Sequence, residues 1–516
     1  MKTILLLALL PISFSLHAQT GLQRTYSTGI PNFSAGLLPS TSGYVLSGSS
    51  NFSYDSSWLN LVFLDAAGDV SSVKSWRASL PLTFINHADH LTSGYLFCGI
   101  GSPNLGPFHP YIAKTDNNGS VQWSKWFDNL EFSSHQLNAM VTNGNAFTVY
   151  SYPDGGSTGF YRIEGDETGS SFSALSVTYA TPAANMRIGK AIPFSTLSDH
   201  LLIGSGSLIP TINGPDGLLI KMNTASVSWS KLFHFGSFIY FDGFSDAMIT
   251  TGDNTIAVAY SQDDVTSVVT SYVVKLNSSG TIDWCKKLAF DNILEMFSIV
   301  ETGSGDLMVC GINNFYDGIL IKLSGNGDLL WARKWTPSIA PATYFTSLYR
   351  DAVTNEIIVS GTHDGAYVLL HLDENGNGCE FEDIIGLQVS DFVAVVADLP
   401  LAITPFTVTT QTENLAERIS TVTTQDICQT GIENVIVENH PVLFPNPASE
   451  MISVLLPVTF GNATLRLFNV AGRKVYASNI NSMSAEIAVG QLEEGIYLLE
   501  IISGDKVWRE KVMVKR

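Results

Sequence analysis

Short hydrophobic runs recur along the chain at intervals of about 50 residues, and each is bounded by Gly, Ser or polar residues. The alternation and length of these runs are typical of β-strands. The seven runs are GYVLSG (43–48), GYLFCG (94–99), FTVYS (147–151), HLLIG (200–204), IAVAY (256–260), LMVCG (307–311) and IIVSG (357–361).

Each run belongs to a longer repeating unit. A variable loop follows, then a second strand that often ends in Lys, a tight turn with Gly, and a strand that carries Trp; another strand precedes each run. Four short strands per unit are typical of a β-propeller blade. The sequence therefore predicts an all-β fold with a seven-bladed propeller over residues 19–389, in which the third unit is degenerate and the repeated Trp fills the wedge between neighbouring blades.

Closing such a ring needs a contact between its two ends, because an open ring exposes sheet edges. Residues 22–27 (LQRTYS) resemble the fourth strand of a unit but precede the first complete one, and the seventh unit lacks its Trp strand. We therefore predict that the N-terminal strand completes the seventh blade. Of the five cysteines, Cys98 and Cys310 occupy strand positions suited to packed thiols, whereas Cys379 and Cys428 are the candidate disulfide that pins the seam.

Residues 390–440 form an extension and linker. Thr and Val alternate between 390 and 432 in the manner of two further strands, which either cap the propeller or lead out of it. From Pro441 the alternation predicts a small immunoglobulin-like β-sandwich of six or seven strands over residues 441–516.

Composition narrows the function. Charged residues make up 14% of the chain and the formal net charge is −20, so the surface repels phosphate backbones and we expect no nucleic acid partner. Residues 1–18 combine Lys2, an apolar run broken by Pro11, and Ala18 before the expected cleavage site, which is typical of a secretory signal peptide. No later segment is long and apolar enough to span a bilayer.

Three short motifs suggest chemistry but have simpler explanations. DENGNG (373–378) begins like a calcium loop at Asp373, but Ile384 stands where the closing Glu belongs, so a hairpin turn is the simpler interpretation and calcium is the alternative; no other cofactor is predicted. GGSTG around Ser157 matches a hydrolase pattern without the strand and helix that its nucleophile needs, so no catalytic residue is predicted. His87 and His90 are interpreted as part of a solvated loop, not a metal site.

The expected ligand site is at the loops that gather near the central channel, where aromatic rings and carboxylates occur together. Rings stack on sugar faces and carboxylates accept sugar hydroxyls, so a glycan is a plausible ligand. A protein partner, a glycosidase or lyase that uses two carboxylates, and a scaffold without a small ligand are the alternatives. The ligand candidates are Asp128, His135, Tyr240, Asp242, Asp291 and Glu295.

The C-terminal segment contains an ordered set of residues: Pro445, Asn446, Pro447, Gly472, Arg473, Gly495, Tyr497, Lys511, Lys515 and Arg516. With this set the segment resembles the sorting domain of type IX secretion cargo. The resemblance implies a route across the inner membrane by the signal peptide and across the outer membrane by the type IX translocon, with removal of the domain by a sorting peptidase. The protein is then released or attached to the outer-membrane surface.

A second, weaker resemblance concerns the repeats. The pattern Lys-apolar-x-x-x-Gly-x-x-x-Trp is similar to the Trp-docking repeat of quinoprotein dehydrogenases. The adjacent cysteines of those enzymes are missing here, so the resemblance supports the blade packing and leaves redox chemistry unsupported.

Overall fold

The computed structural model divides into two compact units, Met1–Cys428 and Gln429–Arg516, which are described separately. In the parts of the chain that the structure describes, all regular elements are strands, and no helix could span a membrane. The structure describes residues 22–427 and 442–515, apart from gaps at 29–31, 41, 54–55, 79–81, 103–106, 129, 131–134, 154–158, 180–184, 197, 208–214, 237–239, 264, 291–292, 337–341, 414, 419, 445, 456–462, 481–483 and 504–505.

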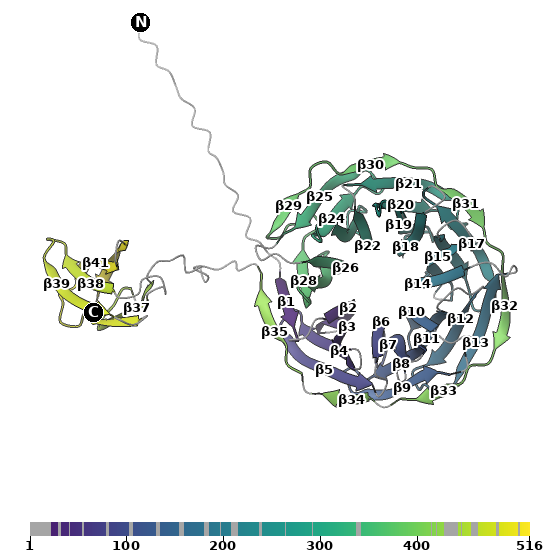
Figure 1. The fold of residues 1–516 in the computed structure, drawn as a ribbon, viewed down its shortest axis with the longest axis horizontal. Helices are drawn as coiled ribbons and strands as arrows, with labels where there is room; N and C mark the ends of the chain where they lie inside the picture. Colours follow the sequence, from purple (N-terminus) through teal and green to yellow (C-terminus); the bar gives the residue numbers. More distant parts are fainter. Residues whose placement is uncertain are drawn as a thin grey trace, which may run out of the picture. The chain divides into compact units, whose positions relative to one another are not determined.

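The first unit contains seven antiparallel sheets arranged around a ring (Figure 1), which fit a seven-bladed β-propeller. Sheet 1 has β2 (Asn32–Ser40), β3 (Gly43–Ser53), β4 (Ser56–Asp65) and β5 (Val70–Ala78); sheet 2 has β6 (Leu82–Leu91), β7 (Gly94–Ser102), β8 (His109–Thr115) and β9 (Val121–Phe127); sheet 3 has β10 (His135–Asn143), β11 (Ala146–Pro153), β12 (Gly159–Asp166) and β13 (Phe172–Tyr179). Sheet 4 has β14 (Asn185–Pro193), β15 (His200–Ser207), β16 (Asp216–Met222) and β17 (Val227–His234); sheet 5 has β18 (Tyr240–Ile249), β19 (Thr255–Asp263), β20 (Val269–Leu276) and β21 (Ile282–Ala289); sheet 6 has β22 (Leu294–Glu301), β23 (Leu307–Asn313), β24 (Gly318–Leu323) and β25 (Leu329–Trp335).

Sheet 7 joins the two ends of the ring, as the sequence predicts. It has β26 (Thr343–Arg350), β27 (Ile357–His363), β28 (Ala366–Leu372) and, as its fourth strand, β1 (Gln23–Ser27). Gln23 pairs with Leu370 and Tyr26 with Tyr367, so the N-terminal strand takes the place that the Trp strand has in other units.

A fifth strand lies on the outer edge of every sheet, and all seven come from one continuous segment that we call the belt, residues 380–427. Its strands lie outside the ring in Figure 1 and pass the sheets in reverse order, from sheet 6 back through sheet 1 to sheet 7. They are β29 (Phe381–Asp383), β30 (Gln388–Asp391), β31 (Val395–Asp398), β32 (Leu401–Phe406), β33 (Thr410–Thr412), β34 (Leu415–Arg418) and β35 (Thr423–Asp426). The belt therefore makes one turn around the ring and covers each outer edge, which would otherwise be open to pairing with another chain.

Between its strands the belt places apolar residues into the cores that join neighbouring sheets. Leu387, Ala394 and Leu399 are buried there, each in a different cluster. In the fourth strands a small residue follows each repeated Trp, so the belt can come close to the strand at this position. The amides of Leu399 and Phe392 donate to the carbonyls of two such residues, Ser230 and Cys285, at 2.9 and 3.0 Å. The belt is thus part of the hydrophobic core as well as of the sheets.

Charge also matches the belt to the ring. In five of the seven sheets a basic side chain of the fourth strand forms an ion pair with an acidic side chain of the belt: Lys74–Glu417, Lys231–Asp398, Lys286–Asp391, Arg333–Asp383 and Arg24–Asp426. Exposed pairs of this kind each contribute about 0–1 kcal/mol, so they help to set the register of the belt more than they add stability.

The repeated Trp and Gly residues contact each other across sheet boundaries, which confirms the predicted wedge. A Cβ atom on Gly280 would lie 2.9 Å from Trp229 of the preceding sheet, and one on Gly376 would lie 2.4 Å from Trp331. Gly280 and Gly376 also have φ values of 77° and 65°, in the left-handed region that glycine tolerates. The Trp face therefore packs directly on the turn of the next sheet.

Each innermost strand carries a β-bulge at the same place, opposite the end of the hydrophobic run. In sheet 4 the bulge brings the carbonyl oxygen of Arg187 to 1.9 Å from where a Cβ of Gly204 would be, whereas the nearest atom to a Cβ on Gly189 is 3.7 Å away. This explains why several of the runs end in Gly.

We expect Gly204→Ala to lower the free energy of unfolding by about 2 kcal/mol or more, because the new methyl group meets backbone that cannot move without breaking the bulge. Gly189→Ala, in the same sheet and with open space around it, should change it by less than about 1 kcal/mol. Urea unfolding of the two variants beside the wild type checks this. Equal destabilisation by both would show that the tight carbonyl contact has no energetic weight.

The C-terminal unit has two antiparallel sheets around one hydrophobic core. One sheet contains β36 (Val442–Phe444), β37 (Met451–Leu455) and β40 (Ser484–Ala488), and the other contains β39 (Lys474–Ile480), β38 (Ala463–Asn469), β41 (Gly495–Ser503) and β42 (Lys506–Val514). Seven strands in two sheets agree with the expected small β-sandwich; its immunoglobulin-like topology stays a prediction.

Candidate functional site

Sheet 3 departs from the repeat at the positions that face sheet 4. Register aligns Glu164 with Lys114, Lys221, Lys275 and Lys322 of other sheets, and its partner Ser173 with Trp123, Trp229, Trp284 and Trp331. Two residues earlier, Arg162 stands where the other six sheets have Leu, Ile or Val: Leu61, Ile112, Leu219, Val273, Leu320 and Leu369. Sheet 1 also has a serine, Ser72, at the Trp position, but it keeps the apolar Leu61. Only in sheet 3, among the described sheets, do polar residues replace both the Trp and the apolar core residue.

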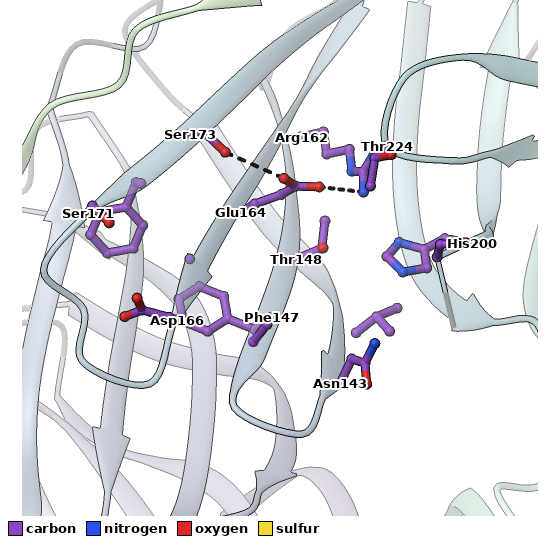
Figure 2. Close-up of a pocket in the computed structure, with 15 residues that line it drawn as sticks. Asn143, Phe147, Thr148, Arg162, Glu164, Asp166, Ser171, Ser173, His200 and Thr224 are labelled. Atoms are coloured by element: carbon purple, nitrogen blue, oxygen red, sulfur yellow. Dashed lines mark hydrogen bonds and ion pairs between the residues drawn. The ribbon is translucent and has the colours of Figure 1, made fainter. Parts of the chain in front are cut away.

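A cavity of about 540 Å³ lies where the Trp is missing (Figure 2). It is lined from sheet 3 by Asn143, Phe147, Thr148, Arg162, Glu164, Asp166, Phe172 and Ser173, and from sheet 4 by Ser198, His200 and Thr224. The volume is within the range of small-molecule sites, about 300–1,000 Å³. These residues come from the turns opposite the inter-sheet connectors, so the cavity is at the other end of the strands from the expected site.

Arg162 is the buried centre of the cavity wall. Its side chain is 1% exposed, one terminal nitrogen forms an ion pair with Glu164 at 2.6 Å, and the other donates to the carbonyl of Asn223 in the next sheet at 2.5 Å. Nε is buried and has no partner with hydrogen-bond geometry among the described residues, although the Tyr150 hydroxyl is close enough to the guanidinium for Arg162 to oppose the rise in the pKa of Tyr150. A buried donor of this kind costs free energy unless something accepts from it, which makes it unusual in a purely structural arginine.

The contact to Asn223 also has a structural role. In sheet 6, Arg333 of the fourth strand donates to the turn carbonyls of Asn375 and Gly376 of the next sheet, and in sheet 2 Lys125 does the same to Gly169. Sheet 3 has Leu175 at that position, and Arg162, its cross-strand partner, makes the contact from the inside. One terminal nitrogen of the Arg162 guanidinium thus joins the two sheets. Arg333 uses its Nε for an ion pair with Asp383 of the belt, whereas Arg162 pairs with Glu164 of its own sheet and leaves Nε unpartnered.

His200 extends the polar wall, and Tyr150 contacts it from behind the wall. The hydroxyl of Tyr150 lies 2.5 Å from Nδ1 of His200, and both side chains are buried. Burial raises the pKa of Tyr150, an effect that Arg162 opposes, so the phenol keeps its proton. We assign this hydrogen bond with Tyr150 as donor, which places the imidazole proton on Nε2 of His200.

The remaining wall combines carboxylates and aromatic rings. Glu164 accepts from Ser173 Oγ at 3.4 Å, and Asp166 accepts the amide of Thr168 at 2.9 Å. The hydroxyl and amide of Thr168 lower the pKa of Asp166, which is opposite to the shift that a general acid needs. Phe147 and Phe172 lie with their ring centroids 6.2 Å apart.

A second cavity of about 750 Å³, which we call the central cavity, lies along the innermost strands and has lining residues from all seven sheets. The bulge residues Asn86, Asn138, Gly189, Ser245, Phe297 and Thr346 lie around it. Its polar groups bind one another: Asn86 donates to Asn138 at 2.6 Å, and Lys190 pairs with the buried Asp246 at 2.5 Å. These contacts hold the inner strands together. None of the described residues that line this cavity has a buried side-chain polar atom without a partner, whereas Arg162 has one.

The ligand candidates expected from sequence that the structure describes have different surroundings. Asp128 accepts from Gln411 of the belt at 2.6 Å, and His135 is buried 3.4 Å from Ser151 Oγ. Asp242 and Glu295 are largely buried, burial raises the pKa of both carboxyl groups, and both contribute to the raised pKa of Tyr260. The side chain of Tyr240 and the whole of Asp291 lie outside the described residues.

Other predictions have mixed outcomes. Asp373 accepts the amides of Asn375 and Asn377 at 2.9 and 3.0 Å, which agrees with a hairpin turn; calcium there stays an untested alternative.

His87 and His90 are not in a loop: both belong to β6, where the backbone pairs with β7, and His87 lines the central cavity. Burial lowers the pKa of His87, and Asp89 opposes this shift. Ser157 lies outside the described residues.

Among the cysteines, Cys98, Cys285 and Cys310 are buried free thiols, as expected for Cys98 and Cys310. Cys379 is disulfide-bonded, and its Sγ lies 3.2 Å from Oε1 of Gln23. The amide of Ile427 donates to the carbonyl of the same Gln23 at 2.9 Å. Cys428 lies outside the described residues, so its pairing with Cys379 stays a prediction, which the shared contact with Gln23 supports.

The residues singled out in the C-terminal unit stabilise its turns and core. Asn446 donates to the carbonyl of Lys511 at 2.8 Å and accepts the amide of Met513, and Tyr497 is buried and donates to the carbonyl of Glu493. Residues 442–515 match the family model of the secretion system C-terminal sorting domain. The C-terminal unit is a type IX sorting domain. Its presence implies export by type IX secretion.

The sorting domain is a small part of the chain, and the remaining similarities to known proteins are weak. No curated protein is significantly similar to this chain. Solved structures that match include Sqt1 from Chaetomium thermophilum, with 11% identity, 67% of this chain and 97% of that chain covered, and a TM-score of 0.35. PorZ, an essential bacterial surface component of the type-IX secretion system of Porphyromonas gingivalis, matches with 9% identity, 95% and 100% coverage, and a TM-score of 0.20. With TM-scores this low, neither likeness bears on the function.

Proposed function

We propose that the protein is a secreted or cell-surface β-propeller that binds a saccharide in the cavity between sheets 3 and 4. The signal peptide, the type IX translocon and its sorting peptidase would deliver it, with the mature chain released or held at the outer-membrane surface. The observation that carries the binding proposal is the local exchange of Trp and an apolar residue for Ser173 and Arg162, which opens the cavity and makes it polar.

The charge balance favours a neutral ligand rich in hydroxyl groups. Arg162 is already paired with Glu164, and Asp166 adds a second carboxylate, so the wall offers no net positive charge to an anion. Carboxylate, imidazole, hydroxyl and amide groups are suited to sugar hydroxyls. The rings of Phe147 and Phe172 lie in the cavity wall, and the partly exposed Phe172 can contact the C–H surface of a pyranose.

Binding is favoured over glycoside hydrolysis. A glycosidase needs one carboxyl group with a raised pKa beside a second free carboxylate. Here Glu164 is engaged by Arg162 and Ser173, and hydrogen bonds lower the pKa of Asp166. The enzyme alternative has its better support at the opposite end, where burial raises the pKa of Asp242 and Glu295.

The test is retention of the purified protein on a panel of insoluble polysaccharides, with release of new reducing ends measured in the same samples. Ser173→Trp is the matched variant: it restores the residue found in sheets 2, 4, 5 and 6 and should fill the cavity from its exposed edge. We expect the wild type to be retained on at least one polysaccharide without releasing sugar, and Ser173→Trp to lose that retention. Equal retention of both proteins contradicts binding in this cavity, and release of reducing ends supports the enzyme.

A further inference from the structure

Three side chains of the types that bind metal ions lie close together at the boundary of sheets 4 and 5, away from the saccharide cavity. Asp216 begins β16, His234 ends β17 and Asp242 lies near the start of β18, and one donor atom from each lies within 4.8 Å of the others. Nδ1 of His234 is 2.9 Å from Oδ1 of Asp216 and 3.4 Å from Oδ2 of Asp242.

The fold holds these side chains in place. Gly217 pairs with Phe233, which puts Asp216 and His234 side by side at the ends of neighbouring strands. The amide of Asp242 donates to the carbonyl of Pro215, and the amide of Phe235 donates to Asp242 Oδ2 at 2.7 Å. Backbone groups thus orient the Asp242 carboxylate, as outer-shell groups do around metal ligands.

An unmet polar group marks the cluster as more than an ion pair. The Asp242 side chain is 0% exposed, and its Oδ1 has no hydrogen-bond partner among the described residues. The hydroxyl of Ser261 lies near Asp242 and opposes the rise in the pKa of that carboxyl group. The contact lacks hydrogen-bond geometry, so the buried Ser261 hydroxyl also has no hydrogen-bond partner among the described residues.

We propose that Asp216, His234 and Asp242 bind a divalent transition-metal cation, for which zinc is the best match. One imidazole and two carboxylates are a donor set that zinc accepts, whereas calcium and magnesium prefer oxygen alone. Zinc bonds of about 2.0–2.2 Å place neighbouring donors roughly 3.3 Å apart. The distances of 2.9 and 3.4 Å from His234 to the two carboxylates are close to this value. His234 and Asp216 are 25% and 26% exposed, so a water molecule or ligand group can reach the remaining position.

The site is independent of the proposed saccharide cavity, so the two ideas can fail separately. The test uses tag-free full-length protein freed of metal by chelation, with zinc, manganese or calcium added in calorimetric titration and in thermal unfolding. His234→Ala removes the nitrogen donor and Asp242→Asn one carboxylate, and His90→Ala, which removes an exposed histidine, is the control.

We expect the wild type and His90→Ala to bind one zinc ion per chain and to gain thermal stability with zinc. His234→Ala and Asp242→Asn should each weaken zinc binding at least about 10-fold and lose the thermal gain. Because His234 is partly exposed, its variant should fold even if Asp242→Asn does not. Absence of stoichiometric zinc binding by the wild type, or zinc binding by His234→Ala as tight as that of the wild type, overturns the proposal and leaves the cluster as an ion-pair network.

Discussion

Replacement of Cys379 by serine is expected to lower the free energy of unfolding by about 4 kcal/mol. The belt starts beside Cys379 and, after one turn around the ring, returns to Gln23 at Ile427, next to Cys428. A disulfide between Cys379 and Cys428 closes a loop of about 50 residues, and removing such a link gives the unfolded chain the corresponding entropy. Because the belt adds the outer strand to all seven sheets, its release should loosen every sheet edge.

Urea unfolding with and without reductant measures this effect. The wild type should move to the lower midpoint when reductant is added, whereas Cys379→Ser should unfold at that lower midpoint in both conditions. The buried thiols Cys98, Cys285 and Cys310 are free in the folded state, so reductant should not act through them. If the urea midpoint of the wild type is the same with and without reductant, the disulfide that closes the belt is contradicted.

Replacement of Arg162 by leucine is expected to weaken binding of the retained saccharide about 100-fold or more while changing the free energy of unfolding by less than about 2 kcal/mol. Leucine stands at the same position in sheets 1, 4, 6 and 7, so the fold accepts it there. The variant loses the contact with Asn223, but it also removes a buried cation with an unmet Nε. Replacing buried charge by an apolar residue is often neutral for stability.

The matched control is Arg333→Leu in sheet 6. Arg333 makes the same kind of contact with the turn of the next sheet, at 2.8 Å, and does not line the cavity. It should reduce stability and leave saccharide affinity unchanged. Titration calorimetry for affinity and urea unfolding for stability separate the two effects, and equal loss of affinity in both variants would mean that Arg162 acts through folding alone.

The repeat made the ring predictable from sequence. Strand length, the Gly turn and the Trp position recur often enough to specify seven four-stranded units, and the missing Trp in unit seven pointed to the strand at Gln23–Ser27. The C-terminal domain was predictable because its boxes lie in a fixed order and match a known sorting domain.

The belt was harder to predict, because its strands are short, with three to six residues each, and several are mostly exposed. They are held by backbone pairing to distant strands, and such pairing leaves little pattern in the segment itself. Two strands were expected between 390 and 432, and the structure has β31 to β35 and part of β30 there. The acidic residues that face Lys231 and Lys286 were the available signal.

The cavity was missed for a different reason. The sequence pattern favours a ligand site at the connectors near the channel, and in sequence the third unit resembles a degenerate copy of the repeat. Arg162, Glu164 and Ser173 differ from the repeat, but only the strand register shows that all three lie at the same sheet boundary. The signal was the buried-strand position of Arg162, which every other unit fills with an apolar residue.

A crystal structure of the protein with the best-retained oligosaccharide is the most direct test of the proposed binding site. The account predicts a sugar ring between sheets 3 and 4, against Phe147 or Phe172, with a hydroxyl or ring oxygen accepting from Nε of Arg162. A sugar bound in the central cavity, or beside Asp242 and Glu295 at the opposite end of the strands, would contradict it.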